Sequence, residues 1–246
     1  MSRFRIGVIG AGIHGERYVR HAARDVPDLE PVQVCRRDRE AGQQLADRYG
    51  CRYQPETDAV ITSPEVDGLI ICTPPSTHFP LAAATVAAGK PVLLEKPMTG
   101  TLVEARELCR LAATAPSLLM VAQTLRWNPV IRKVKELWSS LGRVHFIRLA
   151  QRLAPTQLAW QRNPAESVGG SVLLTGVHLF DLARYLSGGE FALVDSRQRQ
   201  VLHPCLEDNF LARAELEDGT WVSLEVSKYT HSVSCWLEVV GEEAQL

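Results

Sequence analysis

The sequence predicts an α/β protein: an N-terminal doubly wound Rossmann domain over residues 1–123, then a C-terminal α+β domain with a mostly antiparallel open sheet over residues 124–246. Near the start, an apolar run ends in a glycine-rich turn. As far as residue 123, short apolar strands alternate with helical stretches, as in a doubly wound sheet. Beyond residue 126, strands follow one another through short turns, which indicates an antiparallel sheet. A chain of 246 residues is long enough for both domains.

Composition argues against several classes of protein. The formal net charge of −1 gives no general attraction to nucleic acid or to an anionic membrane. No apolar run approaches membrane-spanning length, and the first strand leaves no room for a signal peptide, so we expect a cytoplasmic protein. The six cysteines form no CxxC pair, so the sequence predicts neither a metal site nor a disulfide framework. Most of them are expected to be small buried apolar residues.

The glycine-rich turn over residues 10–15 follows the first strand and precedes a helix over 13–25. In this arrangement backbone N–H groups and the positive end of the helix dipole face a pyrophosphate. Gly10 permits the tight turn, Gly12 lets a phosphate approach the backbone, and Gly15 lets the helix pack closely on its strand. We therefore expect a dinucleotide site, although similar glycines elsewhere only close a loop.

The second strand, over residues 31–35, ends directly before Arg36 and Arg37, and a helix then runs through Arg48. At this place NAD-binding proteins carry an acidic residue that hydrogen-bonds the adenosine ribose, whereas arginine suits a 2′-phosphate. We expect NADP, bound through Arg36 and Arg37. NAD is the alternative if the arginines are only solvated side chains on a surface loop.

Two later strands end in polar residues. The strand over 68–72 runs into Thr73-Pro74-Pro75-Ser76-Thr77-His78, where the prolines exclude helix and Ser76 or Thr77 is expected to cap a helix over 78–88. The strand over 91–94 delivers Glu95-Lys96-Pro97 to the carboxyl edge of the sheet, where open α/β sheets bind ligands.

The remaining elements follow from periodicity and turn residues. Gly169-Gly170 introduces a helix that runs to about residue 186, and Asp218-Gly219 forms a strong hairpin turn. The other predicted helices and strands cover residues 101–114, 118–123, 129–140, 143–152, 191–203, 208–217, 220–230 and 232–240.

Several motifs together resemble the Gfo/Idh/MocA family of nicotinamide-dependent oxidoreductases, named for glucose-fructose oxidoreductase and inositol dehydrogenase. The combination of TPPSTH and EKP is far more specific than the glycine turn alone. Order and spacing agree over nearly the whole chain. The matching text is VIGAGIHG at 8–15, TPPSTH at 73–78, AAGKPVLLEKP at 87–97, RWNP at 126–129 and GGSVLLTGVHLFDL at 169–182.

The resemblance implies a Rossmann domain that carries the cofactor and a sheet domain that carries the substrate pocket and often the contacts of a dimer or tetramer. The lysine of EKP, Lys96 here, lies near the nicotinamide and the substrate in such enzymes. Their usual catalytic partners are an aspartate and a histidine four residues apart. His178 matches the histidine, but Leu174 stands where the aspartate is expected.

This departure removes a group that would act on the histidine. A carboxylate beside an imidazole orients the ring and favours its charged form, and leucine does neither. Positions 174, 178, 181 and 185 share one face of an α-helix, so Asp181 lies on the same face but further along the axis. The chain also stops earlier than is usual for the family, so we expect a smaller sheet or one shielded by another subunit.

The leading functional hypothesis is an NADP-dependent oxidoreductase acting on a sugar, polyol or related hydroxy or carbonyl compound, with Lys96 and His178 as catalytic residues. One alternative is a cofactor-binding regulator or partner subunit with little dehydrogenase activity; another is an enzyme that reduces an imine or enone. We expect a small-molecule substrate and a homo-oligomer, with neither nucleic acid nor membrane as partner. Predicted cofactor contacts are Gly10, Gly12, Ile13, His14, Gly15, Arg36, Arg37, Thr73, Pro74, His78, Glu95 and Lys96, and predicted pocket residues are Arg126, Trp127, Asn128 and Asp181.

Overall fold

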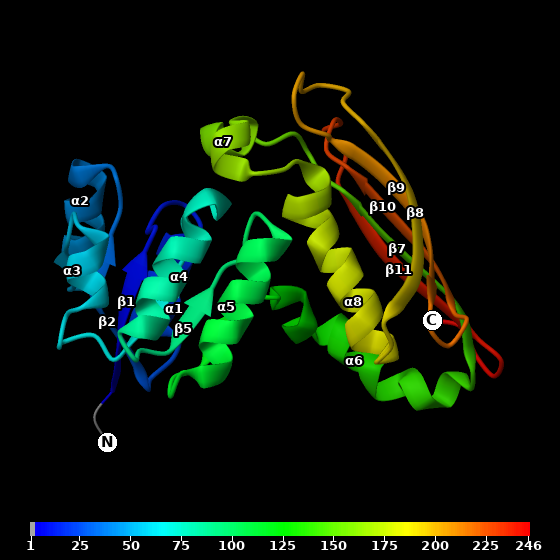
Figure 1. Cartoon of the computed structure of the whole chain (residues 1–246), viewed down its shortest axis with the longest axis horizontal. Coiled ribbons are helices and arrows are strands. Elements are labelled where there is room, and N and C mark those ends of the chain that lie inside the picture. Colours follow the sequence, from blue (N-terminus) through cyan, green and yellow to red (C-terminus); the bar gives the residue numbers. More distant parts are fainter. Residues whose placement is uncertain (1–2) are drawn as a thin grey trace. The chain divides into compact units, whose positions relative to one another are not determined.

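The computed structural model describes residues 3–246 and divides into two compact units, one up to Ala122 and one over Gln123–Leu246. Each unit has its own sheet and its own hydrophobic core (Figure 1).

The first unit is a parallel six-stranded sheet in the order β3-β2-β1-β4-β5-β6, which is the Rossmann topology. Side chains of β1 alternate between its two faces, with Val8 packing in the cluster that includes α1 and α2, and Ile9 in the cluster that includes α3. The strands are β1 (Phe4–Ile9), β2 (Leu29–Cys35), β3 (Arg52–Tyr53), β4 (Gly68–Ile71), β5 (Val92–Leu94) and β6 (Leu119–Val121). The helices are α1 (Gly15–Arg24), α2 (Arg39–Tyr49), α3 (Thr57–Ile61), α4 (His78–Ala87) and α5 (Leu102–Thr114).

Helix starts in this unit follow local side-chain chemistry. The Asp38 carboxylate accepts the N–H of Ala41 at the start of α2, and Thr101 and Glu104 form a reciprocal capping box on α5. The expected cap at Ser76 or Thr77 is wrong. A 3₁₀ turn already begins at Pro75, because proline is tolerated in a first turn, and the Thr77 hydroxyl donates to the carbonyl of Pro74 instead.

The second unit is a mixed five-stranded sheet in the order β11-β7-β10-β9-β8, in which only β7 and β10 pair in parallel among the described strands. Helices α6 and α8 pack on one face of this sheet (Figure 1) and share a core with it. The strands are β7 (Val144–Arg152), β8 (Phe191–Arg199), β9 (Asn209–Leu216), β10 (Trp221–Ser227) and β11 (Ser234–Gly241). The helices are α6 (Pro129–Leu137), α7 (Pro164–Ser167) and α8 (Val177–Ser187), and a π-helical turn over Val172–Gly176 leads into α8.

The cysteines correct one expectation. Among the six, Cys35 is buried, whereas Cys109, Cys205 and Cys235 are exposed, so the expectation that most of them are buried is wrong. Cys51 and Cys72 lie between these extremes. Within residues 3–246, no helix combines the length and the apolar character needed to span a membrane.

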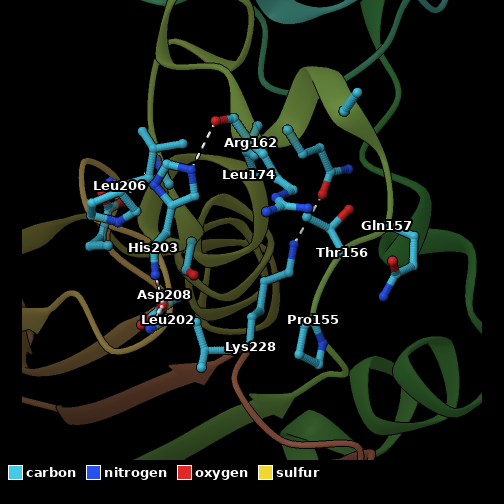
Figure 2. Close-up of a pocket in the computed structure, with 16 residues that line it drawn as sticks. Pro155, Thr156, Gln157, Arg162, Leu174, Leu202, His203, Leu206, Asp208 and Lys228 are labelled. Atoms are coloured by element: carbon cyan, nitrogen blue, oxygen red, sulfur yellow. Dashed lines mark hydrogen bonds between the residues drawn. The ribbon is translucent and has the colours of Figure 1, made fainter.

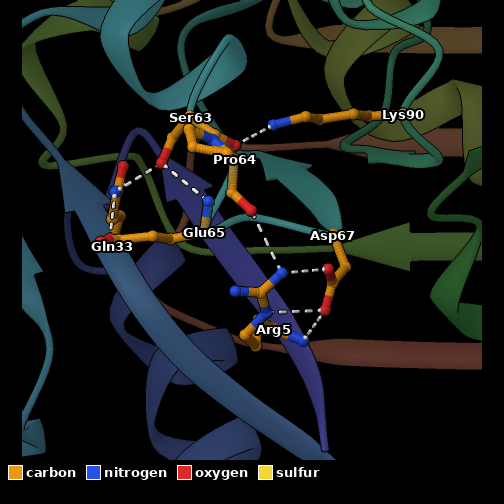
Figure 3. A network of polar contacts seen from close by, with 7 residues as sticks. All are labelled: Arg5, Gln33, Ser63, Pro64, Glu65, Asp67 and Lys90. Atoms are coloured by element: carbon orange, nitrogen blue, oxygen red, sulfur yellow. Dashed lines mark hydrogen bonds and ion pairs between the residues drawn. The ribbon is translucent and has the colours of Figure 1, made fainter.

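A polar network holds the loop before β4 against β1 (Figure 3). The backbone N–H and the guanidinium of Arg5 both donate to the Asp67 carboxylate, at distances of 2.7–3.1 Å. The guanidinium also donates to the carbonyl of Pro64, and the Lys90 ammonium donates to that of Ser63. The bonds from Arg5 lower the pKa of Asp67 to about 2.

The substitution Asp67→Asn is expected to lower the melting temperature at pH 7, by no more than about 3 °C because the pair is partly exposed and screened. The folded pKa of Asp67, about 2, lies below its unfolded value of about 3.9. The stabilisation is therefore complete above about pH 4 and is lost as the pH falls through about 2. Thermal melts of the wild type and the variant between pH 2 and 7 test this, with the exposed Asp28→Asn as control. A difference that persists unchanged at low pH would contradict it.

Candidate active site

The glycine turn between β1 and α1 has the geometry of a phosphate cradle. Gly10 has φ of +85°, and a Cβ there would meet backbone atoms of Cys72 and Thr73 at 2.6 Å. A Cβ on Gly15 would lie 2.3 Å from the Gly10 carbonyl oxygen, so α1 can approach its strand this closely only with glycine. At Gly12, by contrast, a Cβ would meet nothing within 4 Å. The backbone at Gly12 is therefore open to a ligand, which fits a dinucleotide pyrophosphate.

The two arginines predicted to bind a 2′-phosphate lie at the carboxyl end of β2. Arg36 is half-buried, and its carbonyl accepts the hydroxyl of Tyr53 at 3.2 Å, so its main chain is anchored. Arg37 is exposed. The carboxylate of the next residue, Asp38, is used to cap α2.

Glu95 joins the glycine turn to the end of β5. Its Oε1 atom accepts hydrogen bonds from His14 Nε2 at 2.7 Å and from the Tyr18 hydroxyl at 2.8 Å, and its Oε2 accepts the N–H of Lys96 at 3.1 Å. Burial acts to raise the pKa of Glu95, but the bonds from His14 and Tyr18 outweigh it and hold the pKa below its ordinary value. Burial, and then the charge of Glu95, raise the pKa of Tyr18. A buried carboxylate thus fixes the position of α1 relative to the lysine.

Lys96 is half-buried at the end of β5, and burial lowers its pKa while the neighbouring Glu95 opposes the shift. A lysine with a lowered pKa exchanges protons more readily near neutral pH than an ordinary surface lysine. Lys96 therefore has the environment of a proton donor or acceptor.

His78 is the first residue of α4, at the helix start where it was expected, and its side chain is bonded within the protein. Its ring is 1% exposed, with Nδ1 2.7 Å from the carbonyl oxygen of Pro97 and Nε2 2.8 Å from that of Thr73. Burial lowers the pKa of His78, and the two carbonyl bonds act against this. His78 thus ties the turn after β4 to the turn after β5, and its effect on a cofactor would be indirect. Thr73 and Pro74, which begin the first of these turns, are half-buried, while Ile13 on the glycine turn is exposed.

His178 lies in the first turn of α8, directly after the π-helical turn. Its Nδ1 is 3.1 Å from Oε1 of Gln123. With this amide oxygen as acceptor, Nδ1 carries the proton of the neutral ring. Gln123 therefore supplies part of what the expected aspartate supplies, because it orients the ring without adding a charge.

The residues predicted to line a pocket make contacts within the second unit. Asp181 accepts two hydrogen bonds from the Arg126 guanidinium, at 2.8 and 2.5 Å, and this guanidinium also lies over the ring of Tyr185. The Asn128 side chain caps α6 by accepting the N–H of Val130. Trp127 is exposed and is not part of the hydrophobic core.

A pocket of about 670 Å³ lies in the second unit, between the loop after β7, the turn before α8 and the loop before β9 (Figure 2). Leu174, the residue in the expected aspartate position, is 6% exposed and lines it. The predicted pocket residues do not line it. Its walls comprise Pro155, Thr156, Gln157, Ala159, Gln161, Arg162, Gly170, Ser171, Leu174, Leu202, His203, Pro204, Leu206, Glu207, Asp208 and Lys228.

Several of these functional candidates were not found from the sequence. Tyr18 lies about one helical turn after His14, on a helix whose sequence pattern is that of a surface helix. Its spacing gives no indication of a hydrogen bond to Glu95. Gln123 is a polar residue just past a predicted strand, which could have marked it as a candidate. Arg162 and Lys228 lie 66 positions apart, so only the fold brings them to one pocket.

Comparisons with known proteins match both units of the chain. The family described as an oxidoreductase family with an NAD-binding Rossmann fold matches residues 4–123, and the GFO/IDH/MocA C-terminal domain matches residues 131–246. The rhizopine catabolism protein MocA of Rhizobium meliloti is 32% identical over 77% of this chain and 59% of its own length. Inositol 2-dehydrogenase 2 of Saccharopolyspora erythraea is 30% identical over 96% of this chain and 70% of its own.

The fold also matches solved structures. GenD2 from gentamicin A biosynthesis, solved in complex with NAD, has a TM-score of 0.94 and 29% identity, and the match covers 100% of this chain and 72% of GenD2. The chain spans about 60–70% of the length of the two sequence relatives, MocA and inositol 2-dehydrogenase 2. The matched domains, the glycine turn and the lysine after β5 lead to one conclusion: the chain belongs to the Gfo/Idh/MocA family of oxidoreductases.

Proposed function

We propose that this protein is a dehydrogenase that moves a hydride between a nicotinamide dinucleotide and a CH–OH group of a sugar, polyol or related compound. The observation that carries the proposal is the half-buried Lys96, which follows a carboxylate bonded to the helix of the phosphate cradle. The inositol 2-dehydrogenase named above is a relative over most of this chain, which supports a polyol as substrate.

The proposed roles of the residues follow from the proton that the reaction must move. The nicotinamide, when bound, accepts or supplies the hydride. In oxidation the substrate O–H must lose a proton as the C–H loses its hydride, and in reduction the carbonyl oxygen gains one. Lys96 would exchange this proton or polarise the oxygen, and His178 would act as general acid and base while Gln123 holds its Nδ1–H. The second unit would hold the substrate and, in an oligomer, the subunit contacts.

The cofactor is proposed to be NADP, on the strength of Arg36 and Arg37 at the carboxyl end of β2. NAD is the cofactor in the solved complex of GenD2, so the choice needs a direct measurement.

Titration with NADPH and NADH, followed by quenching of tryptophan fluorescence, is expected to show tighter binding of NADPH. In the double variant Arg36→Ser/Arg37→Ser the affinity for NADPH should fall by roughly 10–100-fold while that for NADH stays constant, because two charge-assisted contacts are lost. The variant Arg39→Ser, on α2, is the control. A wild-type preference for NADH would refute the role of the arginines, and failure to bind either nucleotide would refute the dehydrogenase proposal.

Replacing Lys96 by methionine is expected to lower kcat by about 10²–10⁴-fold with little change in nucleotide binding. Lys133→Met, an exposed lysine on α6, serves as control. Because burial lowers the pKa of Lys96, oxidation should speed up as the pH rises through that lowered pKa and frees the amine. Reduction, which needs the ammonium, should slow over the same range. Steady-state rates of oxidation and of reduction, measured against pH, test both expectations. Full turnover by the methionine variant would contradict the catalytic role of Lys96.

A second candidate function, a cofactor-binding regulator or partner subunit, is favoured by one observation only, which is Leu174 in the aspartate position. The substitution Leu174→Asp distinguishes the two. We expect it to lower the dehydrogenase rate by at least about tenfold, because it places a carboxylate in a pocket wall that is 6% exposed. Leu174→Asn and a thermal melt control for shape and folding. A large gain in rate would instead indicate a decayed active site and the regulator function.

A further inference from the structure

The pocket of the second unit combines an apolar wall with two cationic side chains. Leu174, Leu202 and Leu206 contribute apolar surface, and Arg162 and Lys228 contribute the positive charges (Figure 2). Glu207 and Asp208 also line it, so the formal charges of these four side chains cancel. The ligand preference therefore depends on which charges are already compensated by the protein.

Both carboxylates are compensated by backbone donors. Asp208 accepts the N–H groups of Val201, Leu202 and His203 at 2.7–3.1 Å. Glu207 Oε1 accepts the N–H groups of Gly170 and Val172, at 3.1 and 3.0 Å, where the π-helical turn begins. A carboxylate with two or three such donors is stabilised as an anion and has little need of a further cation.

Arg162 is anchored through its main chain. His203 Nδ1 faces the N–H groups of Cys205 and Leu206, so the proton of this ring is on Nε2, which donates to the Arg162 carbonyl at 2.8 Å. Across the part of the chain that the structure describes, the Arg162 guanidinium forms no hydrogen bond or ion pair. Its five N–H donors are thus available to a ligand, in a pocket where the nearby carboxylates are already bonded.

Lys228 adds a second positive charge at the same pocket. Its ammonium donates to Oε1 of Gln161, the neighbour of Arg162, at 3.2 Å. This bond places the ammonium next to the segment that carries Arg162.

We infer that this pocket binds an anionic group, a carboxylate or a phosphate, carried by the substrate, and that Arg162 determines this specificity. The inference rests on the proposed function, because it concerns the substrate of that dehydrogenase. Leu174 lines the pocket and lies four residues before His178, about one helical turn away on the same helical segment. A substrate whose reacting carbon is at His178 can therefore place its far end in the pocket, with its C–H surface against Leu174. The substrate class is an acidic sugar or polyol, or a phosphorylated one.

The test is calorimetric titration of the full chain with matched ligands: a hexose, the corresponding hexuronate and the hexose 6-phosphate, and likewise myo-inositol and its monophosphate. At least one anionic member is expected to bind more tightly than its neutral partner, and added salt should weaken only the anionic member. A higher affinity for the hexuronate identifies a carboxylate, and a higher affinity for the monophosphates identifies a phosphate.

Substitutions then assign the effect to the pocket. Arg162→Met should weaken binding of the anionic ligand by about tenfold or more, Arg162→Lys should weaken it less, and neither should change binding of the neutral partner. Arg132→Met, an exposed arginine on α6 outside the pocket, should have no effect. Since the Arg162 guanidinium has no partner among residues 3–246, thermal melts of these variants should match the wild type.

Three results would overturn the inference: neutral members that bind as tightly as the anionic ones, no binding of any anionic member, or anion binding that Arg162→Met leaves unchanged. Nucleotide titration of the same preparation keeps the two proposals apart. A protein that binds nicotinamide dinucleotide but fails these three tests retains the proposed function, whereas one that binds no nucleotide loses it.

Discussion

The buried carboxylate of Glu95 is the interaction on which the first unit's site depends. It is bonded to His14 and Tyr18 on one side and to the N–H of Lys96 on the other, so a single acidic group connects the phosphate cradle with the candidate proton carrier. Such a group is costly to bury without partners, and each of its bonds offsets part of that cost. Because the partners come from α1 and from the end of β5, the lysine and the cradle hold a fixed geometry before any ligand binds.

In the second unit, a neutral amide and not a carboxylate contacts Nδ1 of the candidate catalytic histidine. The family's usual aspartate is replaced by Leu174, and the ring of His178 is held by the amide of Gln123 instead. An amide orients an imidazole as a carboxylate does, but it does not favour the charged ring. The same substitution gives the neighbouring pocket an apolar wall, so one residue affects both the histidine's environment and the space available to a substrate.

Much of the fold follows from local patterns in the sequence. The glycine turn, the apolar parallel strands and the Asp218-Gly219 hairpin each carry a short-range cause, and the structure confirms an α/β fold with a Rossmann sheet and a mostly antiparallel second sheet. Short elements such as β3 and α3 were not predicted, because two to five residues show no periodicity. Pro75 was misjudged because a first turn tolerates proline, and the cysteines because their burial depends on tertiary packing.

The candidate site was less accessible to prediction than the fold. Motif residues such as Gly10 and Lys96 could be located because their neighbours in sequence define their role. The partners of Arg126, His178 and Glu95 lie between 55 and 81 positions away, and no local pattern encodes such pairings. The pairing of Asp181 with Arg126 joins two predicted pocket residues, and the sequence carries no sign of this bond.

The π-helical turn over Val172–Gly176 has a consequence for how this site can change. A π turn is an α turn with one additional residue, so it stores a length difference at one place without breaking the helix. Downstream, Leu179, Leu182 and Leu186 are packed into the sheet core and keep α8 in its register. Gain or loss of a single residue in the turn would therefore rotate the side chains that face the pocket while leaving the core of the second unit in place. A change of one residue in this turn could therefore alter the substrate preference while the packing of the core stays the same.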